Sequence, residues 1–253
     1  METKTSKTQN WSFLKSAKLF LLVFILIVTL INEADGIYCA IGTSYAEGKY
    51  FFPQNYKKAV EWFKKATNIG DPYGYYCLGL SYDLGRGVMR NNKEAFKWYK
   101  LAAEGGVALA QCNLAWCYEH GDGVEKNINE AVKWYKKAAE NGDLNGIVNL
   151  GCLYHKGNGV EQNYDEAVKL FKRATQGGSE NGMYNLGYCY EFGQGVTQND
   201  DEAFKLYSQA ALKGNEKAQY RLALCYQSGR GTNVDSEKAS YWFKQARING
   251  VQE

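Results

Sequence analysis

Apolar and polar positions recur with a period of 36 residues along most of this 253-residue chain. In five of the six periods a leucine is followed four residues later by a tyrosine, as in Leu78 with Tyr82 and Leu150 with Tyr154, and the first copy has Ile41 with Tyr45. Residues four apart share one face of a helix, so each pair is expected to pack against a partner helix. A glycine or alanine directly after each leucine leaves room for a second backbone. This half of the period predicts one helix.

The other half predicts a second helix with alanine and aromatic positions on its buried face. These positions are Ala59, Trp62, Phe63 and Ala66 in the first copy, then Ala95, Trp98, Tyr99 and Ala102, then Ala131, Trp134, Tyr135 and Ala138. N-caps are expected at Asn55, Asn91, Asn127, Asn163, Asn199 and Asp235. Glutamates three residues later predict capping boxes, at Glu94, Glu130, Glu166 and Glu202. The second helices are expected to end at Gly70, Gly106, Gly142, Gly178, Gly214 and Gly250.

A Gly-x-Gly turn joins the two helices of most copies. It occurs at Gly85–Gly87, Gly121–Gly123, Gly157–Gly159, Gly193–Gly195 and Gly229–Gly231. A fixed period of this size indicates a stack of identical supersecondary units. The sequence therefore predicts an all-α fold, a right-handed α-solenoid of six antiparallel helix-turn-helix repeats of 36 residues. The repeats are expected at about 37–73, 74–109, 110–145, 146–181, 182–217 and 218–253.

The shared pattern, A-x-x-x-L-G-x-x-Y…G-x-G-V…A-x-x-W-Y-x-x-A-A-x-x-G, closely resembles the Sel-1-like repeat family, a relative of tetratricopeptide arrays. The resemblance covers about residues 37–253. A tetratricopeptide array is the near alternative, but it normally has a 34-residue period and lacks the Gly-x-Gly turn. The resemblance implies adaptor roles in protein–protein interaction. These include lumenal members in endoplasmic-reticulum-associated degradation and secreted or periplasmic bacterial members.

Residues 1–36 are expected to form a cleaved signal peptide or an uncleaved signal anchor. Leu19–Ile31 is apolar except for Thr29, and it follows a segment that carries lysines. As a helix this run would be about 20 Å long, which is short against a hydrocarbon core of roughly 30 Å. That length favours the signal peptide. Either form would place the repeats in the endoplasmic reticulum lumen or outside the cell.

The net charge and the cysteine count limit the classes of function and of covalent structure that the chain can have. The net charge is only +3, which argues against a nucleic-acid-binding surface. The seven cysteines are an odd number, so at least one thiol should be unpaired. Cys189 and Cys225 stand one repeat apart and are expected ~8–10 Å from each other, beyond the reach of a disulfide. Buried thiols are therefore favoured over a ladder of disulfides.

Catalytic chemistry has one candidate in this sequence, Cys152 with His155 three residues further on. Such a pair could activate a thiolate. No oxyanion donor or orienting residue is evident beside it, and no cofactor or metal site can be assembled. We therefore expect no enzyme. Two competing classes stay open: a secreted enzyme of β-lactam-hydrolase type, as described for cysteine-rich members of the family, and a structural spacer.

The relationship to tetratricopeptide arrays implies a concave groove that binds a partner. Its lining would come from first-helix positions two before, two after and five after each leucine. These positions also include Cys112, Val148 and Gln227, and the residues predicted to bind the partner are Tyr76, Leu80, Asp83, Trp116, Glu119, Cys152, His155, Tyr184, Tyr188, Glu191, Tyr220 and Leu224. Trp116, Tyr184 and Tyr188 are of a type that dominates binding energetics. The acidic residues among them favour a partner peptide with basic or hydrogen-bond-donor groups.

The sequence thus predicts an interaction scaffold of the secretory pathway or the cell exterior that holds a partner segment in its groove. An adaptor in endoplasmic-reticulum-associated degradation is one form of this hypothesis. Membrane contact is expected only through the N-terminal segment, if it is not cleaved. Only three residues follow Gly250, so no capping helix covers the last repeat. Either substitutions within that repeat protect the end, or another chain packs there, which makes a homo-oligomer through a solenoid end a further hypothesis.

Overall fold

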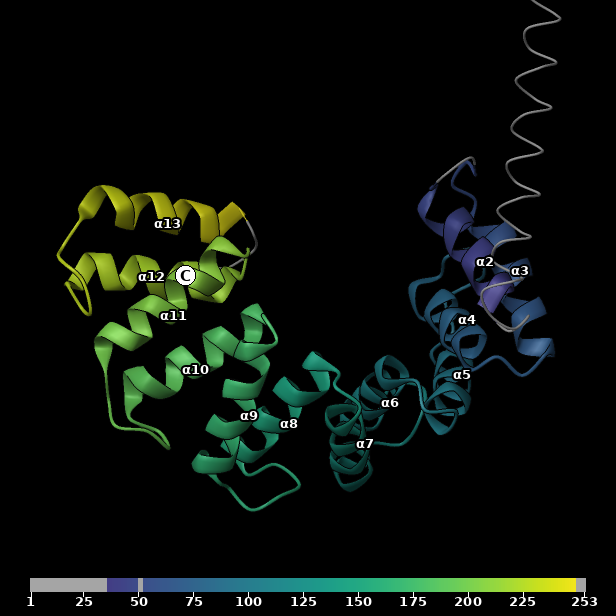
Figure 1. Cartoon of the computed structure of the whole chain (residues 1–253), viewed down its shortest axis with the longest axis horizontal. Coiled ribbons are helices and arrows are strands. Elements are labelled where there is room, and N and C mark those ends of the chain that lie inside the picture. The colour runs from purple at the N-terminus through teal and green to yellow at the C-terminus, as the bar shows by residue number, and fades with distance from the viewer. Residues whose placement is uncertain (1–35, 50–51, 249–253) are drawn as a thin grey trace, which may run out of the picture. The chain divides into compact units, whose positions relative to one another are not determined.

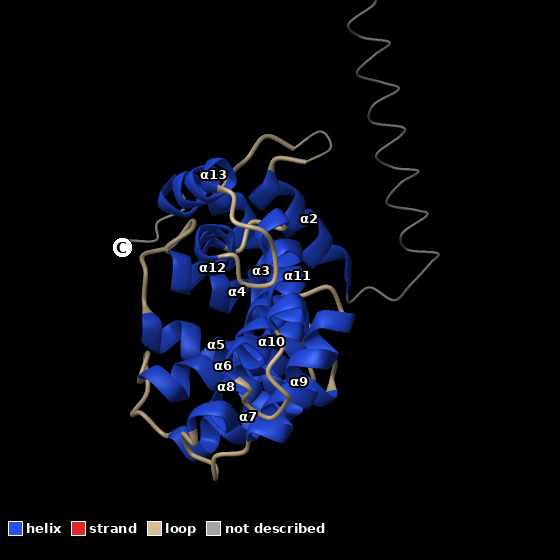
Figure 2. Ribbon diagram, turned by 90° about the vertical axis from the view of Figure 1, so that its left-hand side faces the viewer, coloured by secondary structure: helices blue, strands red, loops and turns tan. Residues whose placement is uncertain are grey.

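The computed structural model describes residues 36–49 and 52–248, and within these ranges the chain forms helices and loops without strands (Figure 2). The predicted leader up to Asp35 and the predicted C-terminal Gly250 lie outside the described residues. None of the described helices is long and apolar enough to cross a membrane. The helices, with their labels in Figure 1, are α2 (Ile37–Glu47), α3 (Tyr56–Asn68), α4 (Pro72–Leu84), α5 (Asn92–Glu104), α6 (Ala108–His120), α7 (Ile128–Glu140), α8 (Leu144–Lys156), α9 (Tyr164–Gln176), α10 (Glu180–Phe192), α11 (Asp200–Leu212), α12 (Glu216–Ser228) and α13 (Ser236–Ile248).

Successive helices pack in pairs, so the predicted fold class of six antiparallel helix pairs is confirmed. The chain divides into two compact units, residues 1–107 and 108–253. Within the described residues, the first unit contains α2–α5 and the second contains α6–α13. In each unit an even-numbered first helix is followed by an odd-numbered second helix that returns along it (Figure 1).

The predicted N-caps of the second helices are present in every repeat. For example, the Asn163 side-chain oxygen accepts a hydrogen bond from the Glu166 amide at 2.9 Å. The other five caps are Asn55, Asn91, Asn127, Asn199 and Asp235, each accepting an amide two or three residues ahead. These bonds satisfy amides that a helix leaves without an internal partner, which is why the second helices begin at fixed points.

The capping boxes predicted at Glu94, Glu130, Glu166 and Glu202 are wrong in their second half. In such a box the glutamate would reach back to the amide of the cap residue. That amide is already used: Asn163 donates it to the Tyr154 carbonyl oxygen at 2.9 Å, and the caps of the other repeats do the same to the tyrosine at the end of their own first helix. Three of these glutamates instead form exposed ion pairs with a lysine one turn on, as Glu166 does with Lys169. The cap amide therefore joins the two helices of the repeat by a hydrogen bond and does not complete a capping box.

The first helices also have caps, which the sequence analysis missed. Asp143 accepts the Gly146 amide at 2.6 Å, and Asn215 accepts the Ala218 amide at 2.8 Å. Both cap side chains are buried. Because a buried polar group is costly unless it is bonded, these caps stabilise the start of α8 and α12 only in this fixed geometry. Val107 stands at the same repeat position before α6 and has no side-chain acceptor.

Glycines end the second helices as predicted, with positive φ at Gly70, Gly106, Gly142, Gly178 and Gly214. The Gly-x-Gly turn has a second requirement that the sequence analysis did not include. A Cβ on Gly195 would lie 2.5 Å from the carbonyl oxygen of Tyr164, the first residue of the preceding repeat's second helix. Gly193 at the other end of the same turn has no contact closer than 3.4 Å. The second glycine is thus needed for a close approach between neighbouring repeats as well as for its φ.

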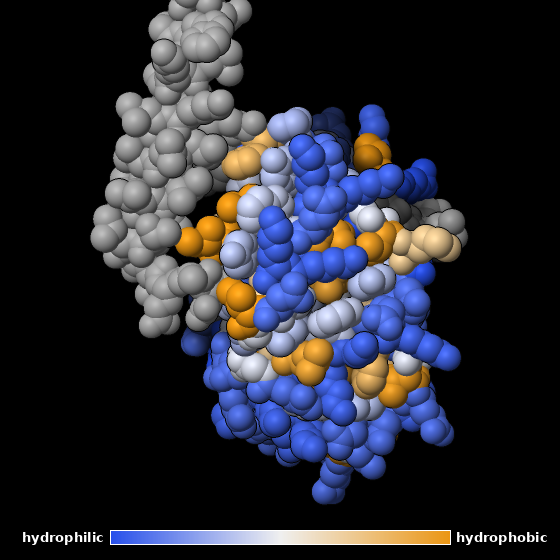
Figure 3. All heavy atoms as spheres, turned by 90° about the vertical axis from the view of Figure 1, so that its right-hand side faces the viewer, coloured by the Kyte–Doolittle hydropathy of each residue, from blue (hydrophilic) through white to orange (hydrophobic). Residues whose placement is uncertain are grey.

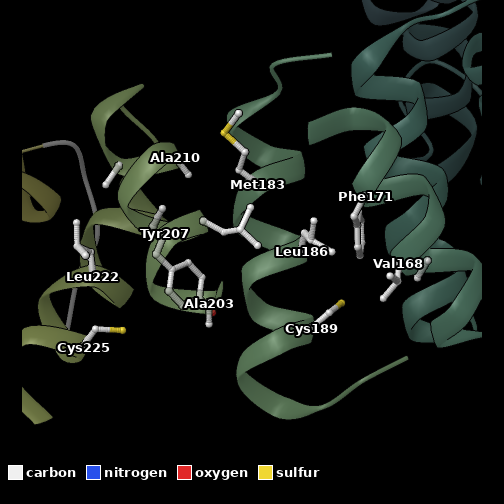
Figure 4. Close-up of a cluster of buried hydrophobic side chains, with 14 residues drawn as sticks. Val168, Phe171, Met183, Leu186, Cys189, Ala203, Tyr207, Ala210, Leu222 and Cys225 are labelled. Carbon is white, nitrogen blue, oxygen red and sulfur yellow. The ribbon is translucent and has the colours of Figure 1, made fainter. Parts of the chain in front are cut away.

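Figure 4 shows a core cluster of the second unit, in which aliphatic, small and aromatic side chains of α9, α10, α11 and α12 pack together. Tyr207, Cys189, Ala210 and Ala218 are fully enclosed in this cluster. The core of the first unit is smaller, and Ala59, Val60, Phe63 and Leu78 form one of its clusters. The seven cysteines, all within the described residues, form no disulfide, and five of them are buried, in keeping with their use as small hydrophobic groups.

Two of the tryptophans predicted for the buried face remain partly exposed. Trp62 stacks on Tyr38 with ring centroids 5.9 Å apart, and Trp98 stacks on Tyr75 at 5.8 Å. Trp134, at the same position in the third repeat, is buried. On the side of the molecule drawn in Figure 3, apolar side chains form separate patches between hydrophilic ones.

Candidate functional site

Three of the acidic residues predicted for the groove are hydrogen-bonded to tyrosines of their own repeat. The Tyr99 hydroxyl donates to Asp83 at 3.0 Å, that of Tyr135 to Glu119 at 2.8 Å and that of Tyr207 to Glu191 at 2.7 Å. Each bond joins the end of a first helix to the middle of its second helix, across 16 residues of sequence. These carboxylates therefore have a structural task within their repeat.

The sequence holds a signal for this pairing that the sequence analysis did not use. The second-helix position is phenylalanine in the other three repeats, at Phe63, Phe171 and Phe243. The matching first-helix residues, each directly after the tyrosine of that helix, are then Ala46, His155 and Gln227, so none of them is acidic. The two positions vary together because a buried tyrosine hydroxyl needs an acceptor and a phenylalanine does not.

Glu191 differs from the other two acids because it is almost enclosed, with 6% of its surface exposed. Besides Tyr207 it receives hydrogen bonds from Arg230 Nη1 at 2.9 Å and from Arg221 Nη1 at 3.3 Å. Burial and the Glu191 carboxylate raise the pKa of the Tyr207 hydroxyl. The three donors come from the helix α11, the helix α12 and the turn after α12, so this carboxylate links the fifth repeat to the sixth.

Aromatic rings lie beside one of the two arginines, Arg221. The rings of Tyr188 and Phe192 lie 4.5 Å apart, and the Arg221 guanidinium lies 5.3 Å from the first and 5.4 Å from the second. The His155 ring of α8 stands edge-on to Tyr188 at 6.0 Å. We call His155, Tyr188, Phe192, Arg221 and Arg230, together with the Glu191 beneath them, the arginine–aromatic face. Phe192 is 46% exposed and the Arg230 side chain 45%, so this face is open to solvent.

The candidate catalytic pair of Cys152 and His155 is not arranged for nucleophilic chemistry. Burial raises the pKa of the Cys152 thiol, which disfavours the thiolate that such a mechanism needs. His155 Nε2 is engaged elsewhere, 2.7 Å from the Gln194 side-chain oxygen. Its ring also packs edge-on against Tyr164 at 5.1 Å. The pair therefore contributes to packing between the fourth and fifth repeats.

The remaining predicted groove residues lie in less organised surroundings. Trp116 is 48% exposed and stacks on His120, with ring centroids 3.7 Å apart. Tyr76, Tyr184 and Tyr220 each pack beside the aromatic ring of the second helix of their own repeat. Leu80, Cys152 and Leu224 are partly buried. Of the predicted set, the structure gathers His155, Tyr184, Tyr188 and Glu191 into one cluster around Arg221, while Tyr76, Leu80 and Asp83 belong to the other unit.

Phe192, Arg221, Gln194 and Arg230 were missed because none occupies a groove position of the tetratricopeptide template. Arg221 did carry a signal. It precedes Leu222 where three earlier repeats have asparagine, at Asn113, Asn149 and Asn185. Among the described residues no group of three or more histidine, cysteine or acidic side chains could hold a metal ion.

Comparison with known proteins agrees with this architecture. The model of the Sel1 repeat family matches residues 38–71, 72–107, 108–143, 145–179, 181–215 and 216–251. No match was found among curated proteins.

Several solved structures match most of this chain. A Sel1 repeat protein from Oxalobacter formigenes is 29% identical over 95% of this chain and 98% of its own, with a TM-score of 0.81. The protective antigen c5321 of uropathogenic Escherichia coli is 35% identical over 85% of this chain, with a TM-score of 0.71, and this chain spans only 46% of its length. The immunity protein Pa5087 from Pseudomonas aeruginosa, at 18% identity, 86% and 83% coverage and a TM-score of 0.56, shares the fold.

Proposed function

Because the chain belongs to the Sel1 repeat family, whose members generally mediate protein–protein interaction, we propose that it is a scaffold whose arginine–aromatic face binds a segment of a partner protein. The observation that carries this proposal is the exposed Tyr188–Phe192 ring pair beside Arg221. Aromatic and arginine side chains are the types that most often dominate binding energy at interfaces.

Rigidity of the face supports the same function. Arg221 is held by Glu191 below it and lies against two rings, and Glu191 is itself fixed by Tyr207. Side chains that are ordered before binding lose less conformational entropy when a partner arrives. Phe192 and Arg230 nevertheless keep nearly half of their surface available for contact.

The experiment begins with proximity labelling from the compartment that holds the repeats, followed by calorimetry with the identified partner and the purified protein. We expect Phe192→Ala to weaken binding by about tenfold or more, as loss of a central aromatic contact does. Leu84→Ala is the matched control, since Leu84 stands at the same repeat position in the first unit and is 48% exposed. Equal affinities of wild type and Phe192→Ala would overturn the assignment of the face.

We further propose that the scaffold works in the endoplasmic reticulum lumen or outside the cell, with an adaptor role in endoplasmic-reticulum-associated degradation as one specific form. The lysine-bearing segment followed by the apolar run Leu19–Ile31 supports this location. A tag on the C-terminus should be protected from protease in intact microsomes or be recovered from the medium. Digestion of the tag in intact microsomes would contradict the proposal.

A further inference from the structure

The arginine–aromatic face carries more positive than negative charge. Two guanidinium groups share the single carboxylate of Glu191, which leaves one positive charge uncompensated at the centre of the face.

Arg230 also retains unused hydrogen-bonding capacity. Its Nε donates to the Ser228 hydroxyl at 3.3 Å and its Nη1 to Glu191 at 2.9 Å. No acceptor for its Nη2 is found among the described residues. A guanidinium presents donors in a planar fork that suits a carboxylate, and such charge-assisted bonds are stronger than neutral ones.

We propose that the segment bound at this face is acidic, with one carboxylate on Arg230 and a neighbouring apolar side chain on the ring pair Tyr188–Phe192. This inference rests on the proposed function and specifies its partner. The acidic residues predicted for the groove had favoured a basic partner peptide, whereas this proposal expects an acidic one. The reason is that Glu191 is enclosed and already paired with two arginines. A basic segment would meet a surplus of like charge.

The chain offers a matched control for Arg230. Arg86 occupies the same place in the Gly-x-Gly turn of the second repeat, between Gly85 and Gly87. Its guanidinium lies 5.5 Å from the Tyr56 ring centroid, with no buried carboxylate beneath it in the described contacts. Arg86→Gln and Arg230→Gln therefore remove the same charge from the same kind of turn. Only the second change alters the arginine–aromatic face.

The probes are three fluorescein-labelled peptides that share two phenylalanines in a glycine–serine background and differ only in glutamate, glutamine or lysine at the remaining positions. Anisotropy titrations with the full chain should show the glutamate peptide binding about tenfold more tightly than the other two, with the difference shrinking as salt is added. Arg230→Gln should abolish that preference, whereas Arg86→Gln should retain it. Circular dichroism of both variants establishes that they are folded.

The outcomes separate this inference from the function on which it rests. Equal binding of the glutamate and glutamine peptides, no binding of the glutamate peptide, or equal losses in the two arginine variants would overturn the acidic segment. If Phe192→Ala still weakens binding of the identified partner, the scaffold function survives that failure. If Phe192→Ala leaves partner binding unchanged as well, both proposals fall.

Discussion

The Tyr207 hydroxyl donates a 2.7 Å hydrogen bond to the enclosed Glu191 carboxylate, and this bond anchors the two arginines of the neighbouring repeat. Charge and hydrogen bonding at Glu191 thus serve both folding and the binding face. A buried acceptor with three donors is costly to remove because each donor then loses a partner.

Glu191→Gln should lower the free energy of unfolding by about 1–3 kcal/mol, because the amide cannot compensate two guanidinium charges. The lower part of this range is expected, since the Arg230 side chain is 45% exposed and solvent can screen it. Urea unfolding followed by circular dichroism measures the change. Glu202→Gln is the control, because Glu202 forms an ion pair with the exposed Lys205, and its loss should change stability by less than about 0.5 kcal/mol.

Stability should fall as pH rises above about 10, where an unfolded tyrosine loses its proton. The pKa values of Tyr135 and Tyr207 are raised by burial and by their glutamate partners, so the folded protein keeps these protons while the unfolded chain releases them. A raised folded pKa gives stability that is present below the unfolded pKa and lost above it.

Tyr207→Phe should reduce the slope of stability against pH in this alkaline range by up to about 1.4 kcal/mol per pH unit, the value for one proton. Phe171 shows that the fold accepts phenylalanine at this position. Urea midpoints compared across the alkaline range test the slope. Identical slopes for wild type and variant would contradict the pairing of Tyr207 with Glu191.

Gly195→Ala should destabilise the protein much more than Gly193→Ala. Both glycines have positive φ, which costs a non-glycine residue about 1–2 kcal/mol. Only Gly195 would also drive its new Cβ into the Tyr164 backbone, which cannot rotate away as a side chain can. Thermal unfolding of the two variants measures this difference. Equal losses of stability would show that glycine is required at both positions only for its positive φ.

Cys77 should be alkylated faster than Cys189 at mildly alkaline pH. Interaction with the Cys39 side chain lowers the pKa of the Cys77 thiol, whereas burial raises that of Cys189 to about 12. The thiolate is the reactive form, so the lower pKa gives the faster reaction. Mass spectrometry of iodoacetamide-treated protein follows each site. Cys39→Ala should slow the reaction at Cys77 without changing that at Cys189.

The full chain should not hydrolyse a chromogenic β-lactam. Burial raises the pKa of Cys152, and His155 Nε2 lies against Gln194, so the thiol is not activated. Hydrolysis that disappears in Cys152→Ala would revive the enzyme hypothesis. Hydrolysis that persists in that variant would point to a contaminant or to a different site.

Local signals in the sequence were sufficient for the helices. The caps at Asn163 and its equivalents depend on residues two or three positions away, and a period of 36 residues repeats that evidence along the chain. The second half of the capping box failed because the Tyr154 carbonyl competes for the Asn163 amide. That carbonyl comes close only after the two helices have paired, so a short window of sequence does not contain it.

The binding face required tertiary information. A template places Glu191 in a groove by its spacing from Leu186, but its exposure depends on Tyr207 and on arginines 30 and 39 residues ahead. Arg230 lies in a turn that the template does not consider. In the sequence, the repeats that have phenylalanine in place of the second-helix tyrosine also lack the acid at the matching first-helix position. This covariation would have identified the acids as hydrogen-bond partners within their own repeats.

The bond from each cap amide to the tyrosine carbonyl of its own helix pair has a consequence for engineering. Every repeat closes its turn with its own main chain, and the second turn glycine meets the start of the preceding repeat's second helix at Gly87, Gly159, Gly195 and Gly231. A 36-residue module could therefore be deleted or duplicated without redesigning a single turn. The length of the array would be adjustable in whole modules, whereas the arginine–aromatic face, built from three particular repeats, would have to be transferred as a block.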